Sequence, residues 1–286
     1  MDFRNAKELL KVCQEQGLSI SAVMLQRELT EGEQDPEETD RKMDRVLEIM
    51  KSAASTPIHT PVKSMGGLIG GEAKKISDHK DTGKGLCGDL LERAVIYAMA
   101  TLETNASMGV IVASPTAGSA GIVPGLLLAL QETYDLSDEQ IKQGLYNASA
   151  IGYLAMRNAT VAGAVGGCQA EVGIASAMAA SATVELMGGS PEQSLAAAST
   201  VLMNMLGLVC DPVGGLVEYP CQNRNAAGVA NATIAAEIAL SGVRQLIPFD
   251  EMLEAVYTVG KADAQRHRLH AQPAICVIKL CNVLQI

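Results

Sequence analysis

The sequence contains no tryptophan, two phenylalanines and six tyrosines, so aromatic residues make up only 3% of its 286 positions. Hydrophobic residues still reach 48%, so the interior must be built from small and aliphatic side chains, including many of the 13 methionines. Alanine, leucine and methionine rank high in helix propensity, and no segment shows a convincing alternation of apolar and polar residues. These features predict an all-α fold with buried alanine-rich helices.

Runs of basic residues are also missing. The formal net charge is −10, and without a cluster of lysine or arginine we expect no nucleic-acid binding. Charges recur at nearly every second or third position in residues 1–11, where no apolar signal core is found. The uncharged stretch 193–210 is interrupted by polar residues and falls short of the roughly 20 apolar residues of a membrane span. We expect a cytoplasmic protein that does not enter a membrane.

Cysteine is present seven times, an odd number that does not suggest a disulfide framework. Cys168, Cys210 and Cys221 are separated by 42 and 11 residues, and no pair has the short spacing of a zinc ribbon. Spacing alone favours buried core residues. Their glycine and proline neighbours favour ligands instead, because loops and helix ends commonly present thiolates to a metal centre. Cys13 and Cys87 lack such neighbours and are interpreted as structural.

Local signals predict where several helices begin. Apolar spacing indicates two short helices between Asp2 and about Leu29, broken at Gly17, and Asp35-Pro36 starts a third that runs to about Ser52. Residues 55–88 are rich in glycine and are expected to be mostly loop. From Leu90 onward, long helices alternate with glycine-rich turns, and residues 137–140 and 190–193 both fit the capping box.

Four glycine-rich segments place glycine beside serine, threonine, cysteine or asparagine. Glycine lets a ligand approach the backbone, and a helix N-terminus attracts anions such as a carboxylate. Taken singly, each segment also fits a plain turn between helices. The segments are Ser64–Gly71 (SMGGLIGG), Ser114–Gly121 (SPTAGSAG), Gly166–Gly173 (GGCQAEVG), and Cys210–Gly215 (CDPVGG) continuing to Pro220–Asn225 (PCQNRN).

In combination, these segments resemble those of the iron–sulfur L-serine dehydratase family, specifically the separate α subunit of the two-subunit bacterial type. The resemblance runs from the N-terminus to about Gly260. It implies a catalytic domain over residues 1–260 and deamination of L-serine to pyruvate and ammonia, a reaction that feeds pyruvate metabolism or gluconeogenesis. It also implies a β subunit as partner, in a heterodimer or a higher oligomer, and no pyridoxal phosphate.

The resemblance further implies a [4Fe–4S] cluster held by Cys168, Cys210 and Cys221. Three protein thiolates leave one iron open, and an open iron can act as a Lewis acid on the β-hydroxyl of serine. Such an iron also predicts sensitivity to oxygen.

Further site residues are predicted from the same segments. Ser64, Met65, Gly66 and Gly67 are expected to bind the substrate carboxylate through backbone N–H groups. Thr116 and Ser119 are expected to bind the carboxylate or the amine, and Asn225 or Arg224 to complete the pocket. Helix capping is the competing interpretation for Ser119 and Asn225. The catalytic base stays unassigned, with Lys63, Lys74, Lys75, His59 and His79 as nearby titratable groups and the β subunit as another source.

After Gly260 the pattern of the family breaks, and residues 261–286 form a divergent tail. This tail holds two of the four histidines and two of the seven cysteines, and we consider a frameshift or local divergence as its origin. Cys276 or Cys281 is a weaker candidate for an additional cluster ligand.

Three other functions remain open. A lyase for another β-substituted amino acid would use the same groups. A non-catalytic cluster sensor would not need Thr116, Ser119 or Asn225, and a structural zinc protein is disfavoured by the 42-residue spacing.

Overall fold

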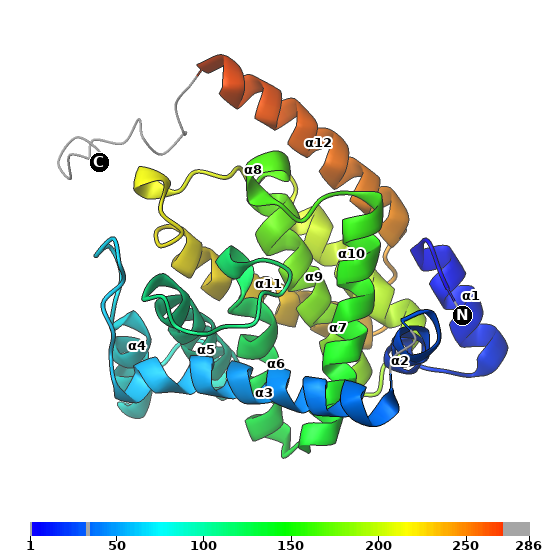
Figure 1. Ribbon diagram of the computed structural model, residues 1–286, viewed down its shortest axis with the longest axis horizontal. Helices are drawn as coiled ribbons and strands as arrows, with labels where there is room; N and C mark the ends of the chain where they lie inside the picture. Colours follow the sequence, from blue (N-terminus) through cyan, green and yellow to red (C-terminus); the bar gives the residue numbers. More distant parts are fainter. Residues whose placement is uncertain (1, 33–34, 271–286) are drawn as a thin grey trace.

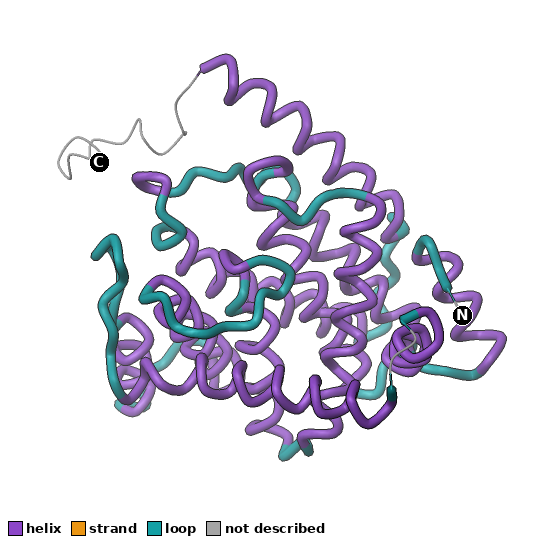
Figure 2. The backbone as a smooth tube through the Cα atoms, viewed as in Figure 1, coloured by secondary structure: helices purple, strands orange, loops and turns teal. Residues whose placement is uncertain are grey.

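The computed structural model describes residues 2–32 and 35–270, and all regular secondary structure within these residues is helical (Figures 1 and 2). The all-α prediction is therefore confirmed, and no strand occurs in the described ranges. Two short 3-10 helices lie at Ala117–Ser119 (η1) and Val213–Gly215 (η2). The α-helices are α1 Ala6–Gln16, α2 Ile20–Glu31, α3 Pro36–His59, α4 Glu72–Asp81, α5 Gly88–Ala106, α6 Ile122–Tyr134, α7 Asp138–Asn158, α8 Gly163–Gly166, α9 Cys168–Leu186, α10 Pro191–Met205, α11 Cys221–Leu240 and α12 Phe249–His270.

Helix α9 lies at the centre of the molecule, with α6, α7, α10 and α11 packed around it (Figure 1). Nearly every residue from Cys168 to Val184 is buried, and alanine occupies six of these positions. A helix that is buried on all sides needs small side chains if its neighbours are to approach closely. The scarcity of aromatic residues therefore has a direct structural counterpart in this crowded centre.

The predicted helix starts are confirmed. Ser137 with Gln140 and Ser190 with Gln193 both form complete capping boxes, and Asp35 accepts a hydrogen bond from the backbone N–H of Glu38 at 2.9 Å. Gly17 ends α1 with a φ of +65°, a conformation that favours glycine. In each case the side chain or glycine satisfies backbone groups that the end of a helix leaves free.

Helix α3 is longer than predicted, because it continues past Ser52 to His59 with Pro57 inside it. Proline has no N–H to donate to the carbonyl four residues earlier, which here belongs to Ala53. The hydroxyl of Thr104 on α5 donates to that carbonyl at 2.8 Å instead. A contact between distant segments thus compensates for a residue that usually breaks a helix.

The segment 55–88 is also more ordered than predicted, because it contains α4 between two loops. Helix α4 begins after Gly71 without a side-chain cap of its own. The buried carboxylate of Glu103 on α5 accepts from the N–H of Ala73 at 2.9 Å and from the side chain of Gln222 on α11 at 3.1 Å. Burial raises the pKa of Glu103. This carboxylate connects α4, α5 and the first turn of α11.

None of the helices among the described residues combines the length and the apolar character that a membrane crossing requires. The predicted domain boundary at Gly260 falls within α12, which continues without interruption to His270. Cys276 and Cys281 lie outside the described residues.

Candidate active site

Three cysteines that are far apart in the sequence lie near one another. Cys168 is the first residue of α9 and Cys221 the first residue of α11, two helices that pack together. Cys210 lies in the loop between α10 and η2, and its side chain is hydrogen-bonded to the thiol of Cys168. Cys221 in turn interacts electrostatically with both. The fold therefore gathers the three predicted ligands at two helix N-termini.

The three thiols differ in their electrostatic environment. The hydrogen bond with Cys210 and then burial raise the pKa of Cys168, and the same hydrogen bond lowers the pKa of Cys210. Burial raises the pKa of Cys221 to about 12. Cys210 is therefore the thiol whose ionised form is favoured, because the S–H group of Cys168 stabilises its charge.

Arg224 holds the cysteine loop from the first turn of α11. Its Nη1 donates to the sulfur of Cys168 at 3.1 Å and to the carbonyl of Val209 at 3.0 Å, and lies 2.5 Å from Oδ1 of Asp211. Burial opposes its positive charge, but Asp211 and Cys168 raise the pKa of Arg224. A fixed guanidinium beside sulfur favours thiolate over thiol.

Within residues 2–32 and 35–270, no three His, Cys, Asp or Glu side chains are arranged as a ready set of metal ligands. The donors nevertheless have the chemistry of an iron–sulfur site, since three cysteines without disulfide partners meet beside a cation at helix N-termini. Cys13 is buried in the helical core, and Cys87 is exposed before α5.

A carboxylate that was not predicted from the sequence connects Thr116 and Ser119 to the cysteine group. The two hydroxyl oxygens are 3.1 Å apart, and Thr116 donates to Oε1 of Glu171, in the first turn of α9. Glu171 also acts electrostatically on Cys210 and Cys221. It stands within the GGCQAEVG segment, where its position three residues after Cys168 placed it on the same helix end.

Two glycines make room for Glu171. A Cβ atom added to Gly118 would lie 2.5 Å from its Oε1, and one added to Gly163 would lie 2.5 Å from its Oε2 and 3.6 Å from the sulfur of Cys210. Neither distance to oxygen is possible for a real side chain, so both positions require glycine or a displaced carboxylate. The carboxylate thus borders glycine backbone on one side and the cysteine group on the other.

Asn225 is fully buried on α11, and its side-chain amide forms hydrogen bonds with backbone groups. Its Nδ2 donates to the carbonyls of Gly118 at 2.8 Å and Cys221 at 2.9 Å, and its Oδ1 accepts from the N–H of Gly121 at 3.1 Å. These contacts tie the segment that carries Thr116 and Ser119 to the helix that begins with Cys221. The geometry supports a positioning role for Asn225.

The loop predicted to bind a carboxylate does hold one, from the chain itself. Oε2 of Glu218 accepts from the hydroxyl of Ser64 at 2.6 Å and from the N–H of Leu68 at 3.0 Å, and its Oε1 accepts from the N–H of Gly66 at 2.7 Å. The N–H of Met65 instead donates to the carbonyl of Ala106, and that of Gly67 to the backbone and hydroxyl oxygens of Ser64. Glu218 is the second functional candidate that the sequence analysis did not single out.

Lys63 is exposed at the edge of the same loop, with its side chain beside Gly67. It lines a small cavity of about 310 Å³ together with Gly67, Gly70 and Glu72. Lys74 forms an ion pair with Asp78 on the surface of α4, and Lys75 lies near Glu72. His59 and His79 are exposed. None of the described contacts of these five groups is with the cysteines.

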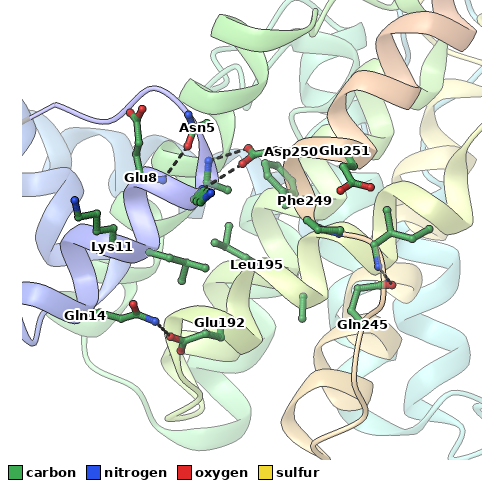
Figure 3. Close-up of a pocket in the computed structure, with 16 residues that line it drawn as sticks. Asn5, Glu8, Lys11, Gln14, Glu192, Leu195, Gln245, Phe249, Asp250 and Glu251 are labelled. Atoms are coloured by element: carbon green, nitrogen blue, oxygen red, sulfur yellow. Dashed lines mark hydrogen bonds between the residues drawn. The ribbon is translucent and has the colours of Figure 1, made fainter.

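A roomier cleft, of about 1120 Å³, lies elsewhere, between α1, the start of α10 and the start of α12 (Figure 3). Apolar side chains such as Leu195 and Phe249 lie in it, and charged side chains border it. Gln14 donates to Glu192 at 2.8 Å across one end, and Asp250 accepts from the N–H groups of Ala6 and Lys7 at 2.8 and 3.2 Å. None of the predicted site residues lines this cleft.

Comparison with known proteins gives a consistent result. Residues 15–272 match the family described as serine dehydratase alpha chain. The chain is 49% identical over 259 residues to the probable L-serine dehydratase alpha chain of Bacillus subtilis, covering 91% of this chain and 86% of that protein. It is 46% identical to the L-serine dehydratase alpha chain of Peptoniphilus asaccharolyticus, covering 91% and 89%. The L-serine dehydratase of Haemophilus influenzae is 33% identical over 98% of this chain, which spans 62% of that longer protein.

Proposed function

The chain belongs to the serine dehydratase alpha chain family, and we propose that it is an L-serine ammonia-lyase that converts L-serine to pyruvate and ammonia. The observation that carries this proposal is the meeting of Cys168, Cys210 and Cys221 at the N-termini of α9 and α11, beside Thr116 and Glu171. The two relatives at 46–49% identity are named as alpha chains of this activity.

Cys168, Cys210 and Cys221 would hold a [4Fe–4S] cluster, with no pyridoxal phosphate. When bound, a cluster held by three thiolates supplies a Lewis-acidic iron that weakens the bond between the β-carbon and the hydroxyl oxygen. Arg224 stabilises the negative charge of the thiolates, and Asp211 fixes the guanidinium in place. Asp211 follows Cys210 directly and Arg224 lies three residues after Cys221. The ion pair therefore connects the two segments that carry these cysteines.

The substrate would be held by groups on two sides of the cysteines. We assign the loop from Ser64 to Gly67, including Met65 and Gly66, to the carboxylate, and Thr116, Ser119 and Glu171 to the α-ammonium group. Glu171 carries the charge that an ammonium ion requires, and the hydroxyl of Thr116 orients it. Asn225 supports this arrangement by fixing Gly118 and Gly121 relative to Cys221.

The reaction itself removes the proton from Cα and the hydroxyl group from Cβ, so that water leaves and an enamine forms. The enamine takes up a proton to become an imine, which water hydrolyses to pyruvate and ammonia. A group from a partner subunit would supply the base. The name alpha chain of the relatives supports a β subunit as that partner, in a heterodimer or a higher oligomer.

Residues 1–260 would form the catalytic unit. The part of α12 before Gly260 contacts the neighbours of Cys168: Gln169 donates to the carbonyl of Val256 at 3.2 Å, and a Cβ on Gly260 would lie 2.7 Å from Gly166. Residues 261–286 form the divergent tail. We place the reaction in the cytoplasm, where reducing conditions keep thiols available as ligands, and its product in pyruvate metabolism or gluconeogenesis.

Pyruvate formation tests the proposal. Protein reconstituted anaerobically with iron and sulfide, together with its β subunit, is expected to release pyruvate and ammonia in equal amounts from L-serine. A panel of L-threonine, L-cysteine and D-serine identifies a lyase for another substrate. A protein that holds its iron and sulfide but turns over none of these amino acids would contradict the proposal and favour a cluster sensor.

A further inference from the structure

Glu218 is a buried carboxylate whose partners are all neutral hydrogen-bond donors. Only 4% of the residue is exposed, and it accepts from the hydroxyl of Ser64 and from the N–H groups of Gly66 and Leu68. Among the described residues, no lysine, arginine or histidine forms an ion pair with it. A buried carboxylate without a cation is stable only where several donors point at it, so the loop is shaped as a receptor for a carboxylate.

The fit is specific in shape. Both oxygens of Glu218 are bound, one by Gly66 and the other by Ser64 and Leu68. A Cβ atom on Gly66 would lie 2.8 Å from Oε1 of Glu218, so a larger residue would press on the bound carboxylate. Ser64 also accepts from the N–H groups of Gly67 and Ile69 at 3.1 and 3.3 Å, which fixes its hydroxyl for donation. Any carboxylate bound here would use the same three donors.

The segment that carries Glu218 is a short surface loop. Its neighbours Val217 and Tyr219 are 45% and 40% exposed, although Glu218 between them is buried. Gly214 and Gly215 just before it have φ values of +62° and +74°, a conformation that favours glycine. Within the binding loop itself, Met65 is 76% exposed. The loop is therefore open to solvent at Met65, next to the donors that Glu218 occupies.

We propose that the loop from Ser64 to Ile69 is the carboxylate site of the substrate and that Glu218 is its internal occupant, which the substrate carboxylate replaces during binding. This inference rests on the proposed function, whose carboxylate loop it extends. The backbone of Glu218 also accepts from the N–H of Gln222 at 2.9 Å, in the turn that contains Cys221. Exchange of the two carboxylates thus links substrate binding to the segment that presents a cysteine of the site.

The test compares ligand binding in Glu218→Gln and in the unmodified complex with the β subunit. L-alanine is the probe, because it has the ammonium and carboxylate groups of serine but no β-hydroxyl to lose, and acetate is a second probe for a carboxylate alone. An internal competitor lowers the apparent affinity in proportion to its occupancy. Replacing it by a neutral amide is therefore expected to lower the Kd of both probes about tenfold by titration calorimetry.

Three further variants complete the design. Ser64→Ala removes a donor that both carboxylates use and is expected to raise the Kd, whereas Glu192→Gln removes an exposed carboxylate far from the loop and is expected to leave it unchanged. If Glu218→Gln does not fold, Glu218→Asp retains the charge but is shorter by one methylene, and it too is expected to lower the Kd. Thermal unfolding of each variant reports whether the fold is retained.

An unchanged or higher Kd in folded Glu218→Gln would overturn the inference and identify Glu218 as an anchor of the loop. Failure of both probes to bind any variant would overturn it as well. Turnover of L-serine by the unmodified complex is measured in parallel. If pyruvate is absent but acetate still binds more tightly to Glu218→Gln, the proposed function fails while the carboxylate site stands.

Discussion

The cleft between α1, α10 and α12 and the cysteine group at α9 and α11 differ in how their polar groups are used. In the cleft, these groups satisfy one another or a nearby helix end, as Gln14 does with Glu192 and Asp250 with the start of α1 (Figure 3). At the cysteine group, Arg224, Glu171 and the neighbouring thiols shift the pKa values of the cysteines. Available volume and reactive chemistry are therefore found in different parts of this molecule.

The cysteine group and the cleft also differ in how closely the backbone approaches the functional side chains. The cysteine group is bordered by glycines, of which Gly118 and Gly163 leave no room for a Cβ atom next to Glu171. The cleft is bordered by residues of α1, α10 and α12 and of the loop before α12, and none of them is glycine. Reactive groups are brought within reach by close approach of backbone, which a wide cleft does not require. Substitutions on the two sides should therefore differ sharply in their consequences.

The largest effect is expected for Cys168→Ala, made in parallel with Cys210→Ala and Cys221→Ala. In the proposed mechanism, loss of one of the three thiolate ligands removes Lewis-acid assistance of several kcal/mol, so L-serine turnover should fall about 1000-fold or more. Pyruvate release and bound iron are the measurements. If one variant kept both iron and turnover, that cysteine would not be a ligand.

Glu171→Gln is expected to be next in size. The neutral amide cannot offer a charged acceptor to the substrate ammonium, a loss of about 2–3 kcal/mol, or roughly 30- to 150-fold in kcat/KM. Steady-state kinetics with L-serine measure it, and iron content should stay at the unmodified level. Iron loss in this variant would instead assign Glu171 to the integrity of the cysteine group.

Asn225→Ala tests the connection between the two helix ends through stability. It leaves the buried N–H of Gly121 and the carbonyl of Gly118 without their partner, which should lower the free energy of unfolding by about 3 kcal/mol. Urea unfolding measures this effect. Asn231→Ala on the same helix is the control, because its contact with Asn204 is exposed and its removal should change stability by less than about 0.5 kcal/mol.

Cys13→Ala provides the matched cysteine from the helical core. Cys13 is 3% exposed, and burial raises its pKa to about 12, so it should be an unreactive apolar residue. Its replacement leaves a small cavity and should lower the free energy of unfolding by about 1 kcal/mol. Turnover and iron content should stay within error of the unmodified protein, and a loss of iron would show that the core cysteine also matters to the site.

The smallest effect is expected in the cleft. Glu192→Gln removes the charge of an exposed side chain paired with Gln14, and exposed pairs contribute only about 0–1 kcal/mol. Stability should change by less than about 0.5 kcal/mol, and turnover of L-serine by less than about twofold. A large loss of turnover would mean that the cleft, and not only the cysteine group, takes part in the reaction.

Much of the fold follows from local sequence signals. The caps at Ser137 and Ser190, the break at Gly17 and the helical composition act within a few residues, so the sequence predicts them directly. The extension of α3 through Pro57 was not predictable in this way. It depends on Thr104, which is brought to Ala53 only by the packing of α5 against α3.

The site divides in the same manner. Glycine-rich segments pointed to Ser64, Thr116 and the cysteines, and the structure places the cysteines, Thr116 and Ser119 near one another. Glu171 and Glu218 were missed, because acidic side chains are common on helices and loops and only their contacts across the fold distinguish them. The roles of all these residues in the reaction remain predictions that the variants above test.

The position of Cys168 and Cys221 at the starts of two packed helices has a consequence for how the protein matures. The 52 residues between them include α10 and all of α9 after Cys168, so the two cysteines come together only through the packing of α9, α10 and α11. The arrangement of the three thiols is therefore a product of the tertiary structure. Insertion of the proposed cluster would therefore require this region to be folded, because an unfolded chain offers only separate single thiols.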